Sequence, residues 1–307
     1  MPFEIKEKEV VIKRSGYLML FSLVLTINFF ACKSSRNLHT NELLWYTYPA
    51  QYWNSQALHL GNGYLGASFF GGADTEIIAL TEKSMWTGGP YRGNLSEIGV
   101  NPKSLSSLPK IRESVIKGNI HKADSLTQHD FLGDDQLFGY FTSIGELAIS
   151  FNHRHQVQDY RRELDLSQSL GRVTYTTGDV RYFREYFCSY PNRILAMKFT
   201  ASRPGAVSFA LTMNVLQDSA AIDIQPPYYY INGFVNENHR PFQVCIHLDN
   251  AGGEVIVKGD SLCVANADTV IVYLTAATNY RLHYPDYSGD YPAITNRRIM
   301  DQVLQQK

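Results

Sequence analysis

Acidic residues in predicted loops are the side chains of this sequence that come closest to a catalytic pair. A hydrolase that works by acid and base catalysis needs two carboxyl groups across a cleft, about 5 Å or about 6.5–9.5 Å apart depending on its stereochemistry. The loop candidates are Glu82, Asp134, Asp135, Asp286 and Asp290. No two of them are picked out by their spacing, and a solvated loop position accounts for each without any chemistry. The sequence therefore presents no catalytic pair.

Two further patterns imitate known binding sites. His153 and His155 follow a predicted strand and share a face if the strand continues, but no third ligand for a metal lies nearby in the sequence. Residues 61–66 have the spacing G-x-G-x-x-G, but they precede a strand instead of following one and opening a helix, as dinucleotide binding requires. Neither a G-x-S-x-G nor a Walker A motif occurs. We therefore predict no cofactor and no metal.

The cysteines give no sign of redox or nucleophilic chemistry. No C-x-x-C spacing exists, which excludes zinc ribbons and thioredoxin-type sites. Cys245 and Cys263 lie in neighbouring strand-like segments and could pair, but small buried thiols inside strands are the interpretation that we favour for them and for Cys188.

The first 42 residues read as a targeting segment and a tether. Lys13 and Arg14 precede an apolar run over residues 17–31, which is short for a membrane span but suits a signal peptide. A small residue directly before Cys32 resembles a bacterial lipoprotein cleavage site, so we predict a signal peptide over 1–31, lipidation of Cys32 and a polar tether over 32–42. An ordinary signal peptide or a membrane anchor are the alternatives. All three interpretations place the remaining chain outside the cytoplasm, in the periplasm or at the cell surface, and the lipid would provide the contact with a membrane.

Composition indicates a globular, β-rich protein. The 307 residues carry a formal net charge of -1, and the isoelectric point is near 6.8, which argues against a nucleic-acid partner. Twenty Tyr and 16 Phe favour strands over helices.

Alternation of apolar and polar residues predicts more than ten short strands. Residues 64–70 and 75–81 read as a hairpin, and from about residue 144 onward the period is two, as in Leu147, Ile149 and Phe151. This pattern predicts an all-β fold, a large antiparallel sandwich or barrel. A small helical insertion is expected after Ser106, Ser107 and Pro109, broken at Gly118-Asn119.

The last fifteen residues, 293–307, have an apolar stripe at helical spacing. Because little of this chain is left for such a helix to pack against, we interpret it as the start of a linker to a following domain. Aromatic loop segments at 86–91 and 226–230 could stack on sugar rings or pack within the sheet edges.

Ordered motifs along nearly the whole mature chain carry a resemblance to a known family. The motifs are Leu44-Trp45-Tyr46, residues 58–67, Phe70-Gly71-Gly72 and residues 78–90, followed by residues 108–112, 159–166, 181–185 and 275–280. Together they resemble the N-terminal domain of glycoside hydrolase family 95, the bacterial α-L-fucosidase family that acts on terminal α-1,2-linked fucose. The likeness covers about residues 43–292 and implies a β-supersandwich domain over that range.

The resemblance also implies that the inverting carboxylates belong to a following (α/α)6 barrel, so no residue here is carried over as a catalytic acid or base. It suggests that Asn62, Glu82 and Trp86 lie at the interface with the barrel or contact sugar. Turn-forming and packing roles are the alternative for all three.

Three functions remain open at this point. The chain is the front portion of a lipoprotein fucosidase, inactive alone; or a free-standing module that binds fucosylated glycans without turnover; or a subunit whose barrel is encoded separately. The unpartnered C-terminal helix favours the first or the third.

Overall fold

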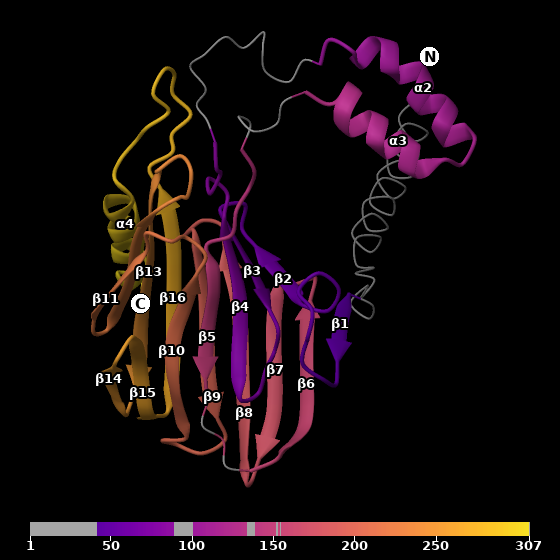
Figure 1. Ribbon diagram of the computed structural model, residues 1–307. Coiled ribbons are helices and arrows are strands. Elements are labelled where there is room, and N and C mark those ends of the chain that lie inside the picture. The colour runs from indigo at the N-terminus through magenta and orange to yellow at the C-terminus, as the bar shows by residue number, and fades with distance from the viewer. Residues whose placement is uncertain (1–41, 89–100, 134–138, 152, 154, 307) are drawn as a thin grey trace, which may run out of the picture. The chain divides into compact units, whose positions relative to one another are not determined.

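The computed structural model describes residues 42–88, 101–133, 139–151, 153 and 155–306 (Figure 1). The predicted signal peptide and Cys32 lie outside these residues. In the described part of the chain, the strands form two sheets in which every neighbouring pair is antiparallel. The all-β prediction is confirmed.

The nine-stranded sheet contains, from edge to edge, β1 (Leu43–Tyr46), β6 (Val157–Asp165), β7 (Leu170–Thr177), β8 (Val180–Ser189), β9 (Ile194–Ala201), β16 (Thr269–Thr278), β13 (Pro241–Ala251), β12 (Tyr228–Phe234) and β11 (Ala221–Gln225). The seven-stranded sheet contains β14 (Glu254–Lys258), β15 (Ser261–Ala267), β10 (Val207–Val215), β5 (Gly145–Ser150), β4 (Thr75–Glu82), β3 (Leu65–Phe69) and β2 (Leu58–Gly61).

The hydrophobic core lies between the two sheets. Leu147 and Ile149 of β5 are fully buried, and Phe151 just beyond it is nearly so, as their alternation predicts. Across the core, the ring of Phe69 on β3 stacks on that of Tyr186 on β8 at 4.7 Å between centroids. A Cβ atom at Gly171 of β7 would come within 2.6 Å of the Phe69 ring, so this close approach of the sheets requires glycine there.

The helical insertion consists of α2 (Ser104–Ile116), α3 (Ile120–Leu126) and the single π-helical turn η2 (Thr127–Phe131). The break between α2 and α3 falls at Gly118 and Asn119 as predicted, with Gly118 at φ 71°. The start differs from the prediction, since α2 begins at Ser104 and contains Pro109. Asn101 sets that start, because its side-chain oxygen accepts from the Lys103 amide at 3.0 Å and its carbonyl from the Ser104 amide at 3.0 Å.

Helix α4 (Pro292–Leu304) packs on the outer surface of the nine-stranded sheet, against β13 and β16 (Figure 1). Ile299 and Val303 contact Ile194 of β9 there. The expectation that this helix has little of the chain to pack against is therefore wrong. The sequence pattern of β9 does not reveal this contact. Ile194 faces α4 and the adjacent Leu195 faces the core, so both are apolar and the usual alternation of apolar and polar residues is missing there.

The three cysteines among the described residues are free thiols, and none of them forms a disulfide. Cys245 on β13 and Cys263 on β15 belong to different sheets, and both are buried, as is Cys188 on β8. Burial raises the pKa of Cys188 and of Cys245 to about 12, which leaves these thiols protonated and poorly reactive. Within the described residues, no helix combines the length and apolar character needed to cross a bilayer.

Candidate functional site

Four segments meet at one end of the sandwich, which we call the loop end: residues 62–64, 82–88, 139–144 and 235–240. The Lys83 amide donates to the Tyr64 carbonyl at 2.9 Å, which joins the first segment to the second. The Thr87 amide donates to the Tyr140 carbonyl at 3.0 Å and joins the second to the third. The candidate residues Asn62, Glu82 and Trp86 all belong to these segments.

Trp86 presents an aromatic surface at the loop end. Its side chain is 49% exposed, and its indole ring lies 5.7 Å from the Phe141 ring, which is 43% exposed. The indole nitrogen donates to the Lys83 carbonyl at 3.1 Å, and the Trp86 carbonyl accepts from the Asn238 side chain at 2.7 Å. One hydrogen bond therefore holds the indole ring and another holds the backbone of Trp86, while the ring remains open to solvent.

A polar group accompanies this aromatic pair. The Tyr140 hydroxyl donates to a carboxylate oxygen of Glu237 at 3.0 Å, and this contact raises the pKa of Tyr140. An exposed ring pair beside a phenol and a carboxylate can stack on the apolar face of a sugar and hydrogen-bond its hydroxyl groups.

Glu82 lies beneath that surface rather than on it. It is 5% exposed, and one carboxylate oxygen accepts from both the amide and the hydroxyl of Ser84, at 2.9 and 2.5 Å. The Ser84 hydroxyl in turn contacts that of Thr278 at 2.6 Å, on β16 of the other sheet. Burial raises the pKa of Glu82, with the Ser84 contacts opposing it. Glu82 therefore fixes the turn that leads to Trp86.

Asn62 also makes internal contacts. Its side-chain oxygen accepts from the amides of Tyr64 and Leu65 at 2.9 and 2.7 Å, which closes the turn between β2 and β3. Its side-chain nitrogen donates to the carbonyls of Ser189 and Ile194 at 2.9 and 3.4 Å, across to the nine-stranded sheet. Residues 61–66 thus form a strand–turn–strand unit, as their place before a strand indicates.

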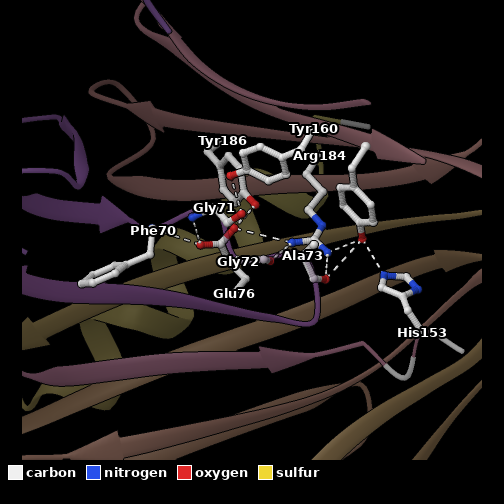
Figure 2. A network of polar contacts seen from close by, with 10 residues as sticks. Phe70, Gly71, Gly72, Ala73, Glu76, His153, Tyr160, Arg184 and Tyr186 are labelled. Carbon is white, nitrogen blue, oxygen red and sulfur yellow. Dashed lines mark hydrogen bonds and ion pairs between the residues drawn. The ribbon is translucent and has the colours of Figure 1, made fainter. Parts of the chain in front are cut away.

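A buried charged network surrounds Glu76, the second residue of β4 (Figure 2). The Glu76 carboxylate accepts from the Gly71 amide at 2.7 Å and from the Tyr186 hydroxyl at 2.6 Å. Arg184 lies 3.6 Å from the same carboxylate and donates to the carbonyls of Gly72 and Ala73 at 2.6 Å each. The Glu76 side chain is fully buried and that of Arg184 almost fully.

The remaining members of the network link it to the neighbouring strands. Arg184 also contacts the Tyr175 hydroxyl, and His153 Nε2 lies 2.7 Å from that hydroxyl. The Tyr160 hydroxyl donates to the Gly71 carbonyl at 2.6 Å (Figure 2). These contacts tie the turn between β3 and β4 to the nine-stranded sheet, and a carboxylate with no access to solvent cannot meet a substrate. We assign the network a structural role.

Sequence reasoning missed this network although the pattern contained a signal for it. Glu76 stands in phase with Ile78 and Leu80, and Arg184 in phase with Tyr186, so both charges occupy inward-facing positions. An ionised group at such a position needs a partner.

The other chemical candidates do not converge on a site. The His155 ring lies beside Gly178, whose added Cβ would meet it at 3.0 Å, whereas His153 joins Tyr175. Asp290 accepts from Arg298 at 3.2 Å, and both side chains are exposed. Asp134 and Asp135 lie outside the described residues. Among the residues that the structure describes, no group of three or more His, Cys, Asp or Glu is arranged to hold a metal ion.

Comparison with known proteins identifies the relatives of this sandwich. Residues 44–283 match the family described as "Glycosyl hydrolase family 65, N-terminal domain". The chain belongs to this family. The residues that match the family, 44–283, include strands of both sheets and the loop end.

Two relatives in sequence are much longer than this chain. The chain is 28% identical to "Alpha-L-fucosidase 2" of Arabidopsis thaliana over 76% of its own length and 30% of the relative. It is 30% identical to "Probable alpha-fucosidase A" of Aspergillus niger over 77% of its length and 30% of the relative. The chain thus spans about 30% of the length of these relatives. Its sequence is that of a glycoside hydrolase N-terminal domain related to α-fucosidases, as the resemblance implies.

A more distant likeness exists among solved structures. A "Putative kojibiose phosphorylase from human microbiome" covers 86% of this chain, and the chain covers 35% of it, with a TM-score of 0.49 and 11% identity. This likeness is too remote to add to the assignment.

Proposed function

We propose that this chain is the non-catalytic N-terminal portion of an exported, inverting α-L-fucosidase of glycoside hydrolase family 95. The supporting observation is the match of residues 44–283 to a glycoside hydrolase N-terminal domain, together with two relatives named as α-fucosidases. The substrate class would be glycans with a terminal α-1,2-linked fucose.

The contacts of the buried carboxyl groups support a non-catalytic role. In the part of the chain that the structure describes, Glu76 and Glu82 are the buried acidic residues, and both accept hydrogen bonds from internal donors. Neither can act as a general acid or base on a bound glycan, because such a group must reach the reacting oxygen. The catalytic acid and base would lie in an (α/α)6 barrel, supplied in cis or as a separate chain.

The loop end is the surface that we assign to the barrel and its substrate. Trp86 and Phe141 form an exposed ring pair, while Glu82 and Asn62 hold the turns behind it. In this arrangement Trp86 contacts sugar or barrel, whereas Glu82 and Asn62 act as positioning residues.

Export and anchoring complete the proposal. Residues 1–31 would act as the signal peptide, Cys32 would carry the lipid, and residues 32–42 would tether the sandwich to a membrane. The test is labelling with palmitate in a bacterial host. The wild-type chain should incorporate the label, and Cys32→Ala should not.

Release of fucose from 2′-fucosyllactose tests the enzymatic part. The purified chain alone should release none, and the same chain joined to or mixed with the barrel should release fucose, with 3-fucosyllactose as the control for linkage. Fucose release by the chain alone would overturn the non-catalytic assignment. Binding of 2′-fucosyllactose without release under every condition would favour a free-standing carbohydrate-binding module.

A further inference from the structure

A groove of about 410 Å³ lies on the outer surface of the nine-stranded sheet, beside α4. Its floor and walls are formed by Asp223 and Gln225 of β11, Tyr228, Tyr230 and Asn232 of β12, Gln243 and Cys245 of β13, and Ala293, Arg297, Met300 and Asp301 of α4. None of these residues belongs to the loop end. The volume falls in the range of about 300–1,000 Å³ that is usual for small-molecule sites.

The groove exists because α4 covers only part of this surface. The Asn296 side chain donates to the backbone and side-chain oxygens of Gln243 at 2.9 and 3.2 Å, which fixes the helix over β13. Ile299 and Val303 then direct it toward Ile194 on β9. The outer surface of β11 and β12 is left uncovered, and α4 forms a wall beside it. The groove is therefore formed by regular elements, with strands β11, β12 and β13 as its floor and α4 as one wall.

Two tyrosine rings supply most of its aromatic surface. Tyr228 and Tyr230 lie two residues apart on β12, so they point to the same side of the sheet. Their rings are nearly parallel, with 5.5 Å between centroids and an interplanar angle of 7°. Both are only partly buried. Burial raises the pKa of Tyr230 to about 12, so its hydroxyl remains a hydrogen-bond donor at neutral pH.

Polar groups of both donor and acceptor type surround these rings. The Gln243 side chain donates to the side-chain oxygen of Asn232 at 2.8 Å, which orients both amides beside Tyr230. Asp223 is the cross-strand neighbour of Tyr230. Arg297 and Asp301 stand on α4 at the opposite wall.

The charges of the lining nearly cancel. Two carboxylates and one guanidinium leave no excess of positive charge for a phosphate or carboxylate ligand. Ring surface together with amide, carboxylate and guanidinium groups matches a ligand with apolar C–H faces and several hydroxyl groups. We propose that this groove binds one unit or a short chain of neutral sugar. The proposal rests on the lining residues and stands whether or not the chain belongs to a fucosidase.

The experiment is a titration of the purified full chain with neutral sugars, in which calorimetry and saturation-transfer NMR measure binding. The probes are L-fucose, D-galactose, D-glucose and lactose, with spermidine and inorganic phosphate as cationic and anionic comparisons. The expected result is millimolar or tighter binding of at least one sugar. Tyr230→Ala should weaken that binding at least ten-fold and Arg297→Ala at least three-fold.

The matched control is Tyr190→Ala, which removes an exposed tyrosine outside the groove and should leave the dissociation constant unchanged. Thermal melting of each variant distinguishes the loss of a sugar contact from the loss of the fold. If Tyr230→Ala is unstable, Arg297→Ala still tests the proposal, because Arg297 is exposed on α4 and its replacement should not disturb the fold. Three results would each overturn the proposal. The first is no binding of any sugar up to about 50 mM, a concentration well above the millimolar dissociation constants of weak binding. The others are sugar binding that both groove variants leave intact, and tighter binding of spermidine or phosphate than of any sugar. Loss of fucose release in the complete enzyme would not bear on it, so the two proposals fail separately.

Discussion

Glu76 and Arg184 lie 3.6 Å apart, carboxylate oxygen to guanidinium nitrogen, in a core that excludes solvent from both. Arg184 also donates to the carbonyls of Gly72 and Ala73, so one side chain neutralises a buried charge and holds a turn. The guanidinium stands 3.7 Å from the centre of the Phe151 ring, which adds a cation–π contact. The pair joins β4 of the seven-stranded sheet to β8 of the nine-stranded sheet.

Removal of one partner should destabilise the fold strongly. Arg184→Met leaves the buried Glu76 carboxylate without its ion-pair partner and the carbonyls of Gly72 and Ala73 without the donor that Arg184 supplies, so we expect a loss of about 3–5 kcal/mol in the free energy of unfolding. Urea denaturation gives the value. Asp179→Asn, which breaks the exposed contact of Asp179 with Arg203, is the matched control and should cost less than about 1 kcal/mol. Equal effects of the two changes would contradict the structural role of the network.

Stability should depend on pH through Glu82. Burial raises the folded-state pKa of Glu82 above its usual value of 4.5, so the folded chain keeps this proton to higher pH than the unfolded chain does. The unfolding free energy that Glu82 contributes should therefore fall as pH rises above about 4.5. The measurement is the difference in unfolding free energy between wild type and Glu82→Gln from pH 4 to pH 7.5.

That difference should shift in favour of Glu82→Gln as pH rises, because glutamine carries no charge to bury. Glu254→Gln, at an exposed site on β14, serves as the comparison variant. A shift in favour of the wild type over the same range would show that the Ser84 contacts outweigh burial.

The aromatic surface of the loop end should matter for turnover but not for folding. In the complete enzyme, we expect Trp86→Ala to lower kcat/KM for 2′-fucosyllactose about ten-fold, the effect of about 1.4 kcal/mol of lost contact. Trp53→Ala removes an equally exposed indole from the segment before β2 and should leave kcat/KM unchanged. Unchanged turnover in Trp86→Ala would exclude a sugar contact at this position.

Helix α4 should contribute to the stability of the sandwich itself. Ile299 is buried against Ile194, so Ile299→Ala should cost about 2 kcal/mol of unfolding free energy. Ile294 lies on the same helix and is 54% exposed, so Ile294→Ala should change it by no more than about 0.5 kcal/mol. Thermal and urea unfolding of the two variants decide the matter. Equal stability of both variants would mean that α4 is not docked in solution.

The sequence allowed prediction of the strands better than of their contacts. Period-two alternation predicts buried residues such as Leu147 and Ile149, because one face of each strand packs against the other sheet. It does not show which strands lie opposite each other. The contact of Asn62 with Ser189 joins residues that are 127 positions apart, and no local pattern encodes it.

The candidate site shows the same division. The residue types of segment 82–88 mark its aromatic and acidic side chains as candidates. They do not show which of these side chains are buried, so Glu82 and Trp86 are equal candidates on the sequence alone. The structure separates them, with the Glu82 side chain inside and the Trp86 ring outside. The partners of Trp86, namely Phe141 and Asn238, come from distant segments and could not be foreseen.

The most direct test of the central claim is the DNA sequence immediately downstream of codon 307 in the source genome. We predict an open reading frame, in the same or a shifted phase or as a neighbouring gene, that encodes an (α/α)6 barrel with its Glu and Asp residues. A stop codon followed only by unrelated genes would contradict the claim that this sandwich serves a fucosidase.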